Sequence, residues 1–379
     1  MNLHDKPFDE TTLTKLQLFE DYAQAWLPTF LMQSHFKKIH IFDFFAGTGY
    51  DLQGKAGSPI RIIDKIIEQR GLIFQKQTEI IFHINEYEKS KFELLVDSCN
   101  KRLAEEIGIE RFVKLKFYNE DFGVLFPELF SLIEKFPSLV YLDQNGVKFL
   151  SSEYFGKLEK TKQTDFLYFA ASSYITRFGE LKEFQPYLSF LDLNELKNSG
   201  YKQVHRNLTN QLKRTLSTNS ELKLYPFTLK KNTNIYGVIF GATHFRAVDK
   251  FLSLTWKYNG LNGDANFDID EEYKNDQLDL FEERKLSKID AFKQIVREKV
   301  LSGEIKTNME MLIFAYENGH IGKHADEVLK ALKKEGKINY QSNSPCVTYE
   351  SAFKNEKKVI YEKVKNRMDR RNMESNNGL

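Results

Sequence analysis

Residues 38–49 read KIHIFDFFAGTG, a dense apolar run that is broken at its end by small residues and glycine. A run of this kind predicts a buried strand of a parallel sheet that ends in a tight turn. Ser58 and Pro59 then open the segment IRIIDKIIEQR, with the serine at an N-cap and the proline at the first helical position. The stretch therefore predicts one strand, loop and helix unit.

The same unit recurs along the chain. Apolar strands are expected at 79–88, 111–121, 138–146 and 164–173, and helices at 11–33, 88–107 and 122–136. Because parallel neighbours need crossover connections, this order predicts a doubly wound, mainly parallel α/β sheet of the Rossmann-like class. Residues 222–244 contain two extended stretches around the polar turn at 230–234, which predicts a C-terminal antiparallel hairpin.

The composition changes abruptly at 264–283, where acidic residues crowd together with a single lysine. Three short amphipathic segments and an extended stretch follow, and helix, helix, helix, ribbon is the order of a winged-helix module. The expected divisions are an α/β domain with an N-terminal helix at 1–260, an acidic linker at 261–286, a winged-helix-like domain at 287–349 and a basic helical tail at 350–379.

The composition also limits the class of protein. The 379 residues are 41% hydrophobic and 28% charged, which is typical of a soluble globular protein and not of a disordered or fibrous one. The N-terminus lacks the basic start and apolar run of a secretory signal, and no apolar run approaches the ~18 residues that span a bilayer. Cys99 and Cys346 lie too far apart in sequence to propose a disulfide framework or a metal knuckle. We therefore expect a cytoplasmic protein without membrane contact.

The glycine loop DFFAGTG at 43–49 is the strongest chemical signal. A P-loop requires Gly-Lys-Ser/Thr, and a dinucleotide fingerprint requires a third small residue where Leu52 stands. A site for S-adenosylmethionine (SAM) fits better, because glycines let the chain turn tightly and let the methionine part of the cofactor approach the backbone. Asp43 would engage the amino-acid end of the cofactor, directly or through water, and a purely structural turn is the alternative. The expected cofactor-binding residues of this loop are Asp43, Phe45, Gly47 and Gly49.

A second cofactor contact is expected at the end of the next strand, where one carboxylate can accept both ribose hydroxyls. Glu86 occupies this place, and Glu88 is the alternative. Glu86 lies farther from the glycine loop than the usual ~20 residues, so extra residues are expected at 50–57 and 71–78. After the third strand, Asp121 is expected at the adenine amino group and Phe122 against its ring face. Asp121 also fits the N-cap of the next helix, and the two roles do not exclude each other.

The fourth strand ends in YLDQNG at 141–146, where the reactive sulfur of the cofactor is expected. Asp143 and Asn145 are the expected catalytic residues, which would position or deprotonate the methyl acceptor. Enzymes that methylate amino groups of nucleic acids use Asp/Asn-Pro-Pro-Tyr at this place. This chain has neither proline, and Tyr154 or Tyr174 would have to supply the aromatic ring, so nucleobase amino methylation is disfavoured.

Together these motifs resemble the bacterial three-Cys-motif partner protein (TcmP) family. The likeness rests on DFFAGTG, GSPI at 57–60, NEYE at 85–88, LDQNG at 142–146 and FGATH at 240–244 with Trp256, and covers nearly the whole chain. It implies a class I SAM-dependent methyltransferase fold, in which a parallel sheet ends in an antiparallel hairpin, with SAM as the cofactor. It also implies a partner, encoded nearby, that carries three clustered cysteines. The family commonly has Asp-Pro-aromatic-Gly after the fourth strand, so Gln144-Asn145 departs from it.

Two functions of different classes follow from these observations. The first is an enzyme that transfers a methyl group from SAM to nucleic acid or to a macromolecular partner. The second is a catalytically silent SAM-fold adaptor that delivers a cysteine-rich, radical-SAM-like protein to nucleic acid. The fold alone does not decide between them.

The third helix of the winged-helix-like domain carries lysines that fit phosphate groups, so contact with DNA or RNA is expected there and at the basic tail. A solvated helix face is the alternative. His320 and His324 lie four residues apart, but no acid or thiol completes a ligand set, so no metal site is expected. The lysines of this predicted contact are Lys323, Lys330, Lys333 and Lys334.

Overall fold

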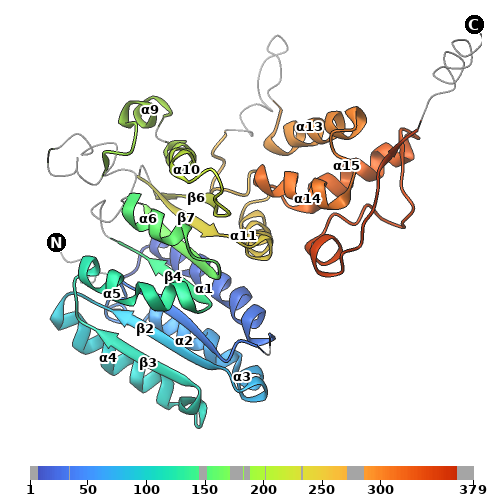
Figure 1. Ribbon diagram of the computed structural model, residues 1–379. Coiled ribbons are helices and arrows are strands. Elements are labelled where there is room, and N and C mark those ends of the chain that lie inside the picture. Colours follow the sequence, from blue (N-terminus) through green and yellow to red (C-terminus); the bar gives the residue numbers. More distant parts are fainter. Residues whose placement is uncertain are drawn as a thin grey trace, which may run out of the picture. The chain divides into compact units, whose positions relative to one another are not determined.

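The computed structural model describes residues 7–33, 35–144, 152–170, 182, 188–200, 202–231, 234–270 and 286–364. Contacts divide the chain into two compact units (Figure 1). The first unit comprises Met1–Leu254 with Asp264–Phe267, and the second comprises Thr255–Gly263 with Asp268–Leu379.

The first unit is built on a seven-stranded sheet with the order β3-β2-β1-β4-β5-β7-β6. β1 to β5 are parallel, whereas β7 runs antiparallel to both β5 and β6. This arrangement confirms the predicted mainly parallel sheet with a terminal antiparallel hairpin. The strands are β1 Lys38–Asp43, β2 Glu79–Asn85, β3 Val113–Tyr118, β4 Ser138–Leu142, β5 Thr164–Ala170, β6 Lys223–Lys231 and β7 Asn234–Ala242.

Helices cover both faces of the sheet, because alternate strand residues point to opposite sides. Val140 belongs to an apolar cluster with residues of α5, α6, α9 and α10, whereas its neighbour Tyr141 stacks on Phe19 of α1 with ring centroids 3.8 Å apart. The helices of this unit are α1 Glu10–Leu31, α2 Ser58–Glu68, α3 Arg70–Lys76, α4 Lys89–Ala104, η1 Ile109–Arg111, α5 Phe122–Lys135, α6 Ser152–Glu159, α9 Leu193–Asn198, α10 Val204–Thr215 and α11 Phe245–Tyr258, whose last turn belongs to the second unit.

The close pairing of β7 with β5 depends on a glycine. A Cβ atom added at Gly241 would lie 2.0 Å from Cζ of Phe166, which is opposite it in the ladder. We therefore expect Gly241→Ala to lower the free energy of unfolding by about 3 kcal/mol, the upper end of overpacking costs. The matched control is Gly156→Ala in α6, where no heavy atom lies within 4 Å of the added Cβ. It should stabilise the protein by about 1 kcal/mol through helix propensity. Urea unfolding measures both, and equal shifts would contradict the close packing.

The second unit has the helix, helix, helix, ribbon order that the sequence predicts for a winged helix. Its helices are α13 Lys288–Ser302, α14 Asn308–Glu317 and α15 Gly322–Lys334, and β8 Ile338–Asn339 pairs antiparallel with β9 Glu362–Lys363. Local sequence fixes two of the helix starts. Ser287 caps α13, and Thr307 with Glu310 forms a reciprocal capping box at α14.

The boundary of the predicted tail is wrong for residues 350–364. These residues do not form a separate helix: η2 Glu350–Lys354 is a single short turn, and β9 closes the ribbon with β8. Asn308 holds this segment by donating to the carbonyls of Cys346 and Lys357, and Tyr361 donates to the carbonyl of Pro345. The rest of the basic tail, 365–379, lies outside the described residues.

The structure also differs from the predicted linker, 261–286, near its N-terminal end. Asp264 binds Arg206 through two hydrogen bonds of 2.7 and 2.9 Å, and the backbone of 264–266 bonds to Thr228 of β6. Residues 264–267 therefore belong to the first unit, and residues 271–285 lie outside the described residues. Composition identified the acidic stretch but not this ion pair, because Arg206 is distant in sequence.

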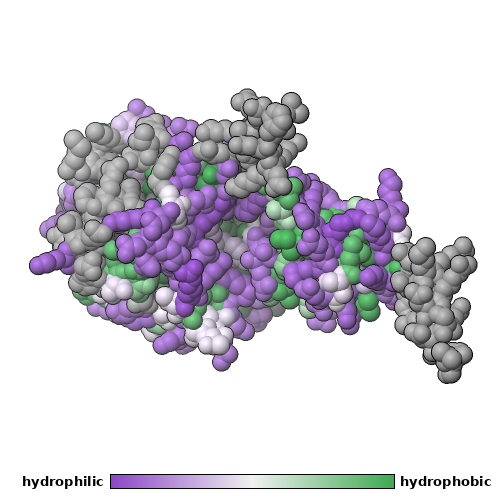
Figure 2. Space-filling model, turned by 90° about the horizontal axis from the view of Figure 1, so that it is seen from above, coloured by the Kyte–Doolittle hydropathy of each residue, from purple (hydrophilic) through white to green (hydrophobic). Residues whose placement is uncertain are grey.

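On the face drawn in Figure 2, most of the coloured surface is hydrophilic, with smaller hydrophobic patches between. Within the described part of the chain, no helix combines the length and the apolar character needed to cross a membrane.

Candidate cofactor site

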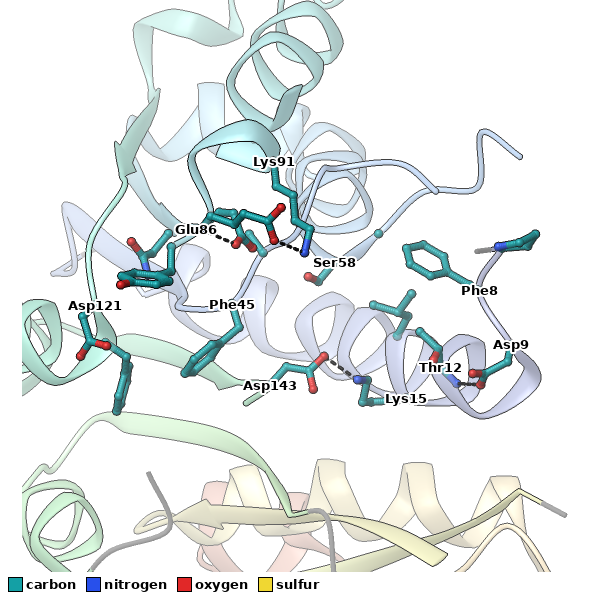
Figure 3. A pocket seen from close by; sticks show the side chains of 18 residues that line it. Phe8, Asp9, Thr12, Lys15, Phe45, Ser58, Glu86, Lys91, Asp121 and Asp143 are labelled. Atoms are coloured by element: carbon teal, nitrogen blue, oxygen red, sulfur yellow. Dashed lines mark hydrogen bonds and ion pairs between the residues drawn. The ribbon is translucent and has the colours of Figure 1, made fainter. Parts of the chain in front are cut away.

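A cavity of about 470 Å³ lies at the carboxyl ends of β1, β2 and β4 (Figure 3). Its walls come from the N-terminal segment 7–16, the loop 45–58, the segment 85–91, the start of α5 and Asp143. Ligands of open α/β sheets bind at this edge, and pockets for small molecules have volumes of about 300–1,000 Å³. The cavity therefore has the place and size expected of a cofactor site.

A hydrogen bond joins the glycine loop to the acid after β2, the two segments that are predicted to bind the cofactor. The N–H of Gly47 donates to Oε2 of Glu86 over 2.9 Å, so the loop after β1 and the acid after β2 meet at the cavity. Gly47 and Gly49 have φ angles of +69° and +88°, a region that side-chain-bearing residues rarely adopt. A Cβ at Gly49 would also lie 3.0 Å from Cβ of Ser98 in α4. These two glycines shape the loop and do not themselves line the cavity.

Asp43 lies beneath the cavity, with 1% of its surface exposed. It accepts hydrogen bonds from Ser58 Oγ over 2.5 Å and from the N–H of Phe45 over 3.2 Å. The pKa of Asp43 is raised to about 7, chiefly by burial and also by the charges of Asp143 and Glu86, against the lowering effect of these hydrogen bonds. Ser58 lines the cavity and Asp43 does not, so the aspartate reaches the site through the serine.

Glu86 stands at the rim with both carboxylate oxygens oriented by backbone N–H groups. Oε2 accepts from Gly47, and Oε1 accepts from the N–H of Glu88 over 2.9 Å. Each carboxylate oxygen has two lone pairs, so the group keeps the capacity to accept ligand hydroxyls. The extra residues that the sequence requires between the loop and this acid form the loop 50–57 and α3.

Asn85, one residue earlier, is a positioning residue that sequence reasoning missed. Its buried amide donates to the carbonyls of Phe44 and Glu120 over 3.0 and 3.1 Å, and its oxygen accepts from the N–H of Glu120. One side chain thus joins the loops that follow β1, β2 and β3. A polar residue at the last position of an otherwise apolar strand is the sequence feature that could have indicated this role.

Phe45, Asp121 and Phe122 line the cavity together. Asp121 caps α5 by accepting from the N–H of Gly123 over 2.8 Å, which confirms the capping role. The rings of Phe45 and Phe122 have centroids 5.2 Å apart, and Tyr154 lies 5.0 Å from Phe122. These aromatic faces suit a planar ring in the cavity.

Asp143 also lines the cavity, and its carboxylate is paired. Lys15 of α1 lies 2.5 Å away, and the two side chains are only 11% and 17% exposed. The next residue, Gln144, is buried and donates to the hydroxyl of Tyr168 over 2.6 Å. The predicted Asn145, like the alternative aromatic Tyr174, lies outside the described residues.

The N-terminal segment is a second feature that sequence reasoning missed. The N–H of Phe8 donates to Asp51 Oδ2 over 2.8 Å, and Asp51 Oδ1 accepts from the N–H groups of Gln53 and Lys55. The loop after β1 thereby fastens the segment that precedes α1 over the cavity. The helix at 11–33 was predicted, but nothing in its spacing indicated which residues would reach the site.

The predicted lysines of α15 do not share one environment. Lys333 donates to the carbonyl of Tyr340 and lies 3.9 Å from its ring, and Lys330 pairs with Asp326 at 2.5 Å. Lys323 and Lys334 are exposed. Lys330 is exposed as well, whereas Lys333 is half-buried.

His320 and His324 lie in the core of the second unit. Their Nδ1 atoms are 3.0 Å apart, and the ring of His320 stacks on Phe292 with centroids 3.9 Å apart. Burial lowers the pKa of His320 to about 2 and that of His324 to about 4, so both imidazoles are neutral at pH 7.

Comparisons with known proteins bear on both units. A family model described as a GMT-like wHTH domain matches residues 264–345. The solved complex of Trm1 from Pyrococcus horikoshii with SAM aligns at 12% identity and a TM-score of 0.36, over 64% of this chain and 59% of its own. An O-methyltransferase from Bacillus cereus in complex with SAH aligns at 12% identity and a TM-score of 0.31, over 62% and 91%. Human methyltransferase 10 domain containing protein aligns at 10% identity and a TM-score of 0.28, over 63% of this chain and 85% of its own.

No curated protein matches the chain. This chain spans less than two thirds of the length of Trm1. The fold class of the first unit therefore rests on its strand order, and that of the second on its helix order and the family match.

Proposed function

We propose that the first unit is a SAM-dependent methyltransferase, with the cofactor in the cavity at the carboxyl ends of β1, β2 and β4. The observation that carries the proposal is the meeting of Gly47 and Glu86 at this cavity. A carboxylate fixed by backbone N–H groups at the end of β2 has the chemistry to accept ribose hydroxyls.

The roles of the residues follow from their places. Glu86 would hold the ribose, Phe45 and Phe122 the adenine ring, and Asp43 with Ser58 the amino-acid end. When bound, SAM supplies an electrophilic methyl group. Asp143 would orient the nucleophile of the acceptor, and catalysis would depend mainly on such alignment.

A transfer assay tests this function. The full chain is incubated with methyl-labelled SAM and, separately, with mixed DNA, mixed RNA and the product of the neighbouring gene that carries three clustered cysteines. Label on one of these acceptors, lost in an Asp143→Ala variant that still binds SAM, is the expected result. Label that persists in this variant would remove Asp143 from the reaction.

A silent adaptor is the second candidate, and two observations favour it. Lys15 already neutralises Asp143, and Tyr168 holds the Gln144 side chain that replaces the proline of related motifs. A chain that binds SAM without transferring label, and that captures the three-Cys-motif protein, would support the adaptor.

The protonation of Asp43 should make cofactor affinity depend on pH. With a pKa of about 7, Asp43 is mostly neutral at pH 5.5 and mostly ionised at pH 7.5. Because the ionised form attracts the ammonium and sulfonium of SAM, we expect affinity to rise about tenfold across this range. Calorimetric titration measures it, and Asp43→Asn should flatten the profile. An unchanged slope in that variant would exclude Asp43 as the titrating group.

We further propose that the second unit contacts nucleic acid through Lys323 and Lys334. For a Lys323→Ala/Lys334→Ala variant, the slope of log affinity against log salt should fall by about 2, because each phosphate contact contributes ~0.9. Fluorescence anisotropy on a mixed-sequence duplex measures this slope. A Lys160→Ala/Lys197→Ala variant of the first unit is the matched control. Equal slopes in all three proteins would remove α15 from the interface.

A further inference from the structure

The cavity contains an excess of carboxylates that a cationic ligand would complement. Among the described residues that line it, five are acidic and two are lysines. Each lysine already has a carboxylate partner, since Lys15 pairs with Asp143 and Lys91 with Glu88 at 2.6 Å. The acidic residues are Asp9, Glu86, Glu88, Asp121 and Asp143.

The two lysines differ in how they are held. Lys91 lies in the first turn of α4, three residues after the N-cap Glu88, and this glutamate side chain is 41% exposed. Lys15 instead reaches Asp143 from α1, its ammonium lies 4.3 Å from the centroid of the Phe169 ring, and both partners are largely buried. Figure 3 shows Lys15 and Asp143 pointing toward each other, with Phe45 beside the aspartate. Charge at this position is poorly screened by solvent, so a nearby ligand responds to it strongly.

We propose that Lys15 is a specificity-determining residue of the cofactor site, which occupies the cation position at Asp143 and so sets the preference between SAM and its product. This inference rests on the proposed function. S-adenosylhomocysteine (SAH) differs from SAM by the lost methyl group and its positive charge. The Lys15 ammonium repels the sulfonium of SAM but not the neutral thioether of SAH. Lys15 therefore disfavours SAM relative to SAH, and Asp143 has the opposite effect.

Calorimetric titrations of SAM and SAH into the wild-type protein and four full-length variants test this inference. Lys15→Met leaves Asp143 without its counter-ion and should shift the affinity ratio about tenfold toward SAM. Asp143→Asn leaves the ammonium and should shift it about tenfold toward SAH. The double variant should restore the wild-type ratio. Lys91→Met is the matched control, because it removes the other cavity lysine and should change the ratio less than about twofold.

The ratio of the SAM affinity to the SAH affinity distinguishes an electrostatic effect of Lys15 from a purely structural one. An ion pair that only fastens α1 to the sheet would change the affinities for SAM and SAH equally. Lys15→Gln, which keeps a polar side chain, replaces Lys15→Met if the latter does not fold. Equal ratios in the wild type and the Lys15 variants would overturn the inference while the proposed cofactor site stands. A wild-type protein that binds neither ligand would instead refute the proposed function.

Discussion

Glu86→Ala is expected to weaken SAM binding by about 100-fold, the largest effect of any single change at the site. Two hydrogen bonds from ribose hydroxyls to a carboxylate contribute about 1.5 kcal/mol each, and ~3 kcal/mol corresponds to about 100-fold in affinity. The substitution also removes the acceptor of the Gly47 N–H, which loosens the loop that borders the cavity. Calorimetric titration of the full chain measures the change.

Glu88→Ala is the control for this experiment, because Glu88 lines the same cavity and was the alternative from sequence. Its carboxylate pairs with Lys91, and we expect its loss to change SAM affinity by less than about threefold, as for a partly exposed ion pair. If Glu88→Ala had the larger effect, the ribose contact would belong to Glu88 and the assignment of Glu86 would be wrong.

Among substitutions at the site, Asn85→Leu should lower the free energy of unfolding most, and it should also weaken cofactor binding. The change removes one buried and two partly buried hydrogen bonds, each worth about 1 kcal/mol, and leaves backbone groups of Phe44 and Glu120 without this partner. We expect the free energy of unfolding to fall by about 3 kcal/mol. SAM binding should weaken as well, because the amide joins the loops that present Glu86 and Asp121.

Asn119→Leu provides the comparison. Asn119 also donates to two carbonyls, those of Glu86 and Tyr87, but one of these bonds is exposed to solvent. Water can replace an exposed partner, so the loss should be about 1 kcal/mol or less. Urea unfolding monitored by tryptophan fluorescence distinguishes the two variants. Equal losses would show that Asn85 is not the junction between the loops.

The sequence could predict those parts of the site that depend only on where a residue lies along a single strand or loop. A buried strand followed by glycines places Gly47, and an acid at the end of the next strand places Glu86, since parallel strands end at the same edge. The hairpin at 223–242 followed in the same way from a polar turn between two extended stretches. Each inference needed only local pattern and the direction of a strand.

The parts that sequence could not predict depend on packing between distant segments. In the sequence, Lys15 is one polar residue of an amphipathic helix. Its contact with Asp143 arises only because α1 packs beside β4. Asp51 is one of many loop acids, and its bond to Phe8 links positions 43 residues apart. The ribbon partner at 362–363 was read as part of a helical tail because its charged composition resembles a solvated helix.

A crystal structure of the full chain with SAH at saturating concentration tests the central claim most directly. The account predicts density in the cavity bounded by the loop 45–58 and the segment 85–91, with the two ribose hydroxyls on the carboxylate of Glu86. Density for the nucleoside elsewhere, or a Glu86 side chain turned away from its sugar, would contradict it.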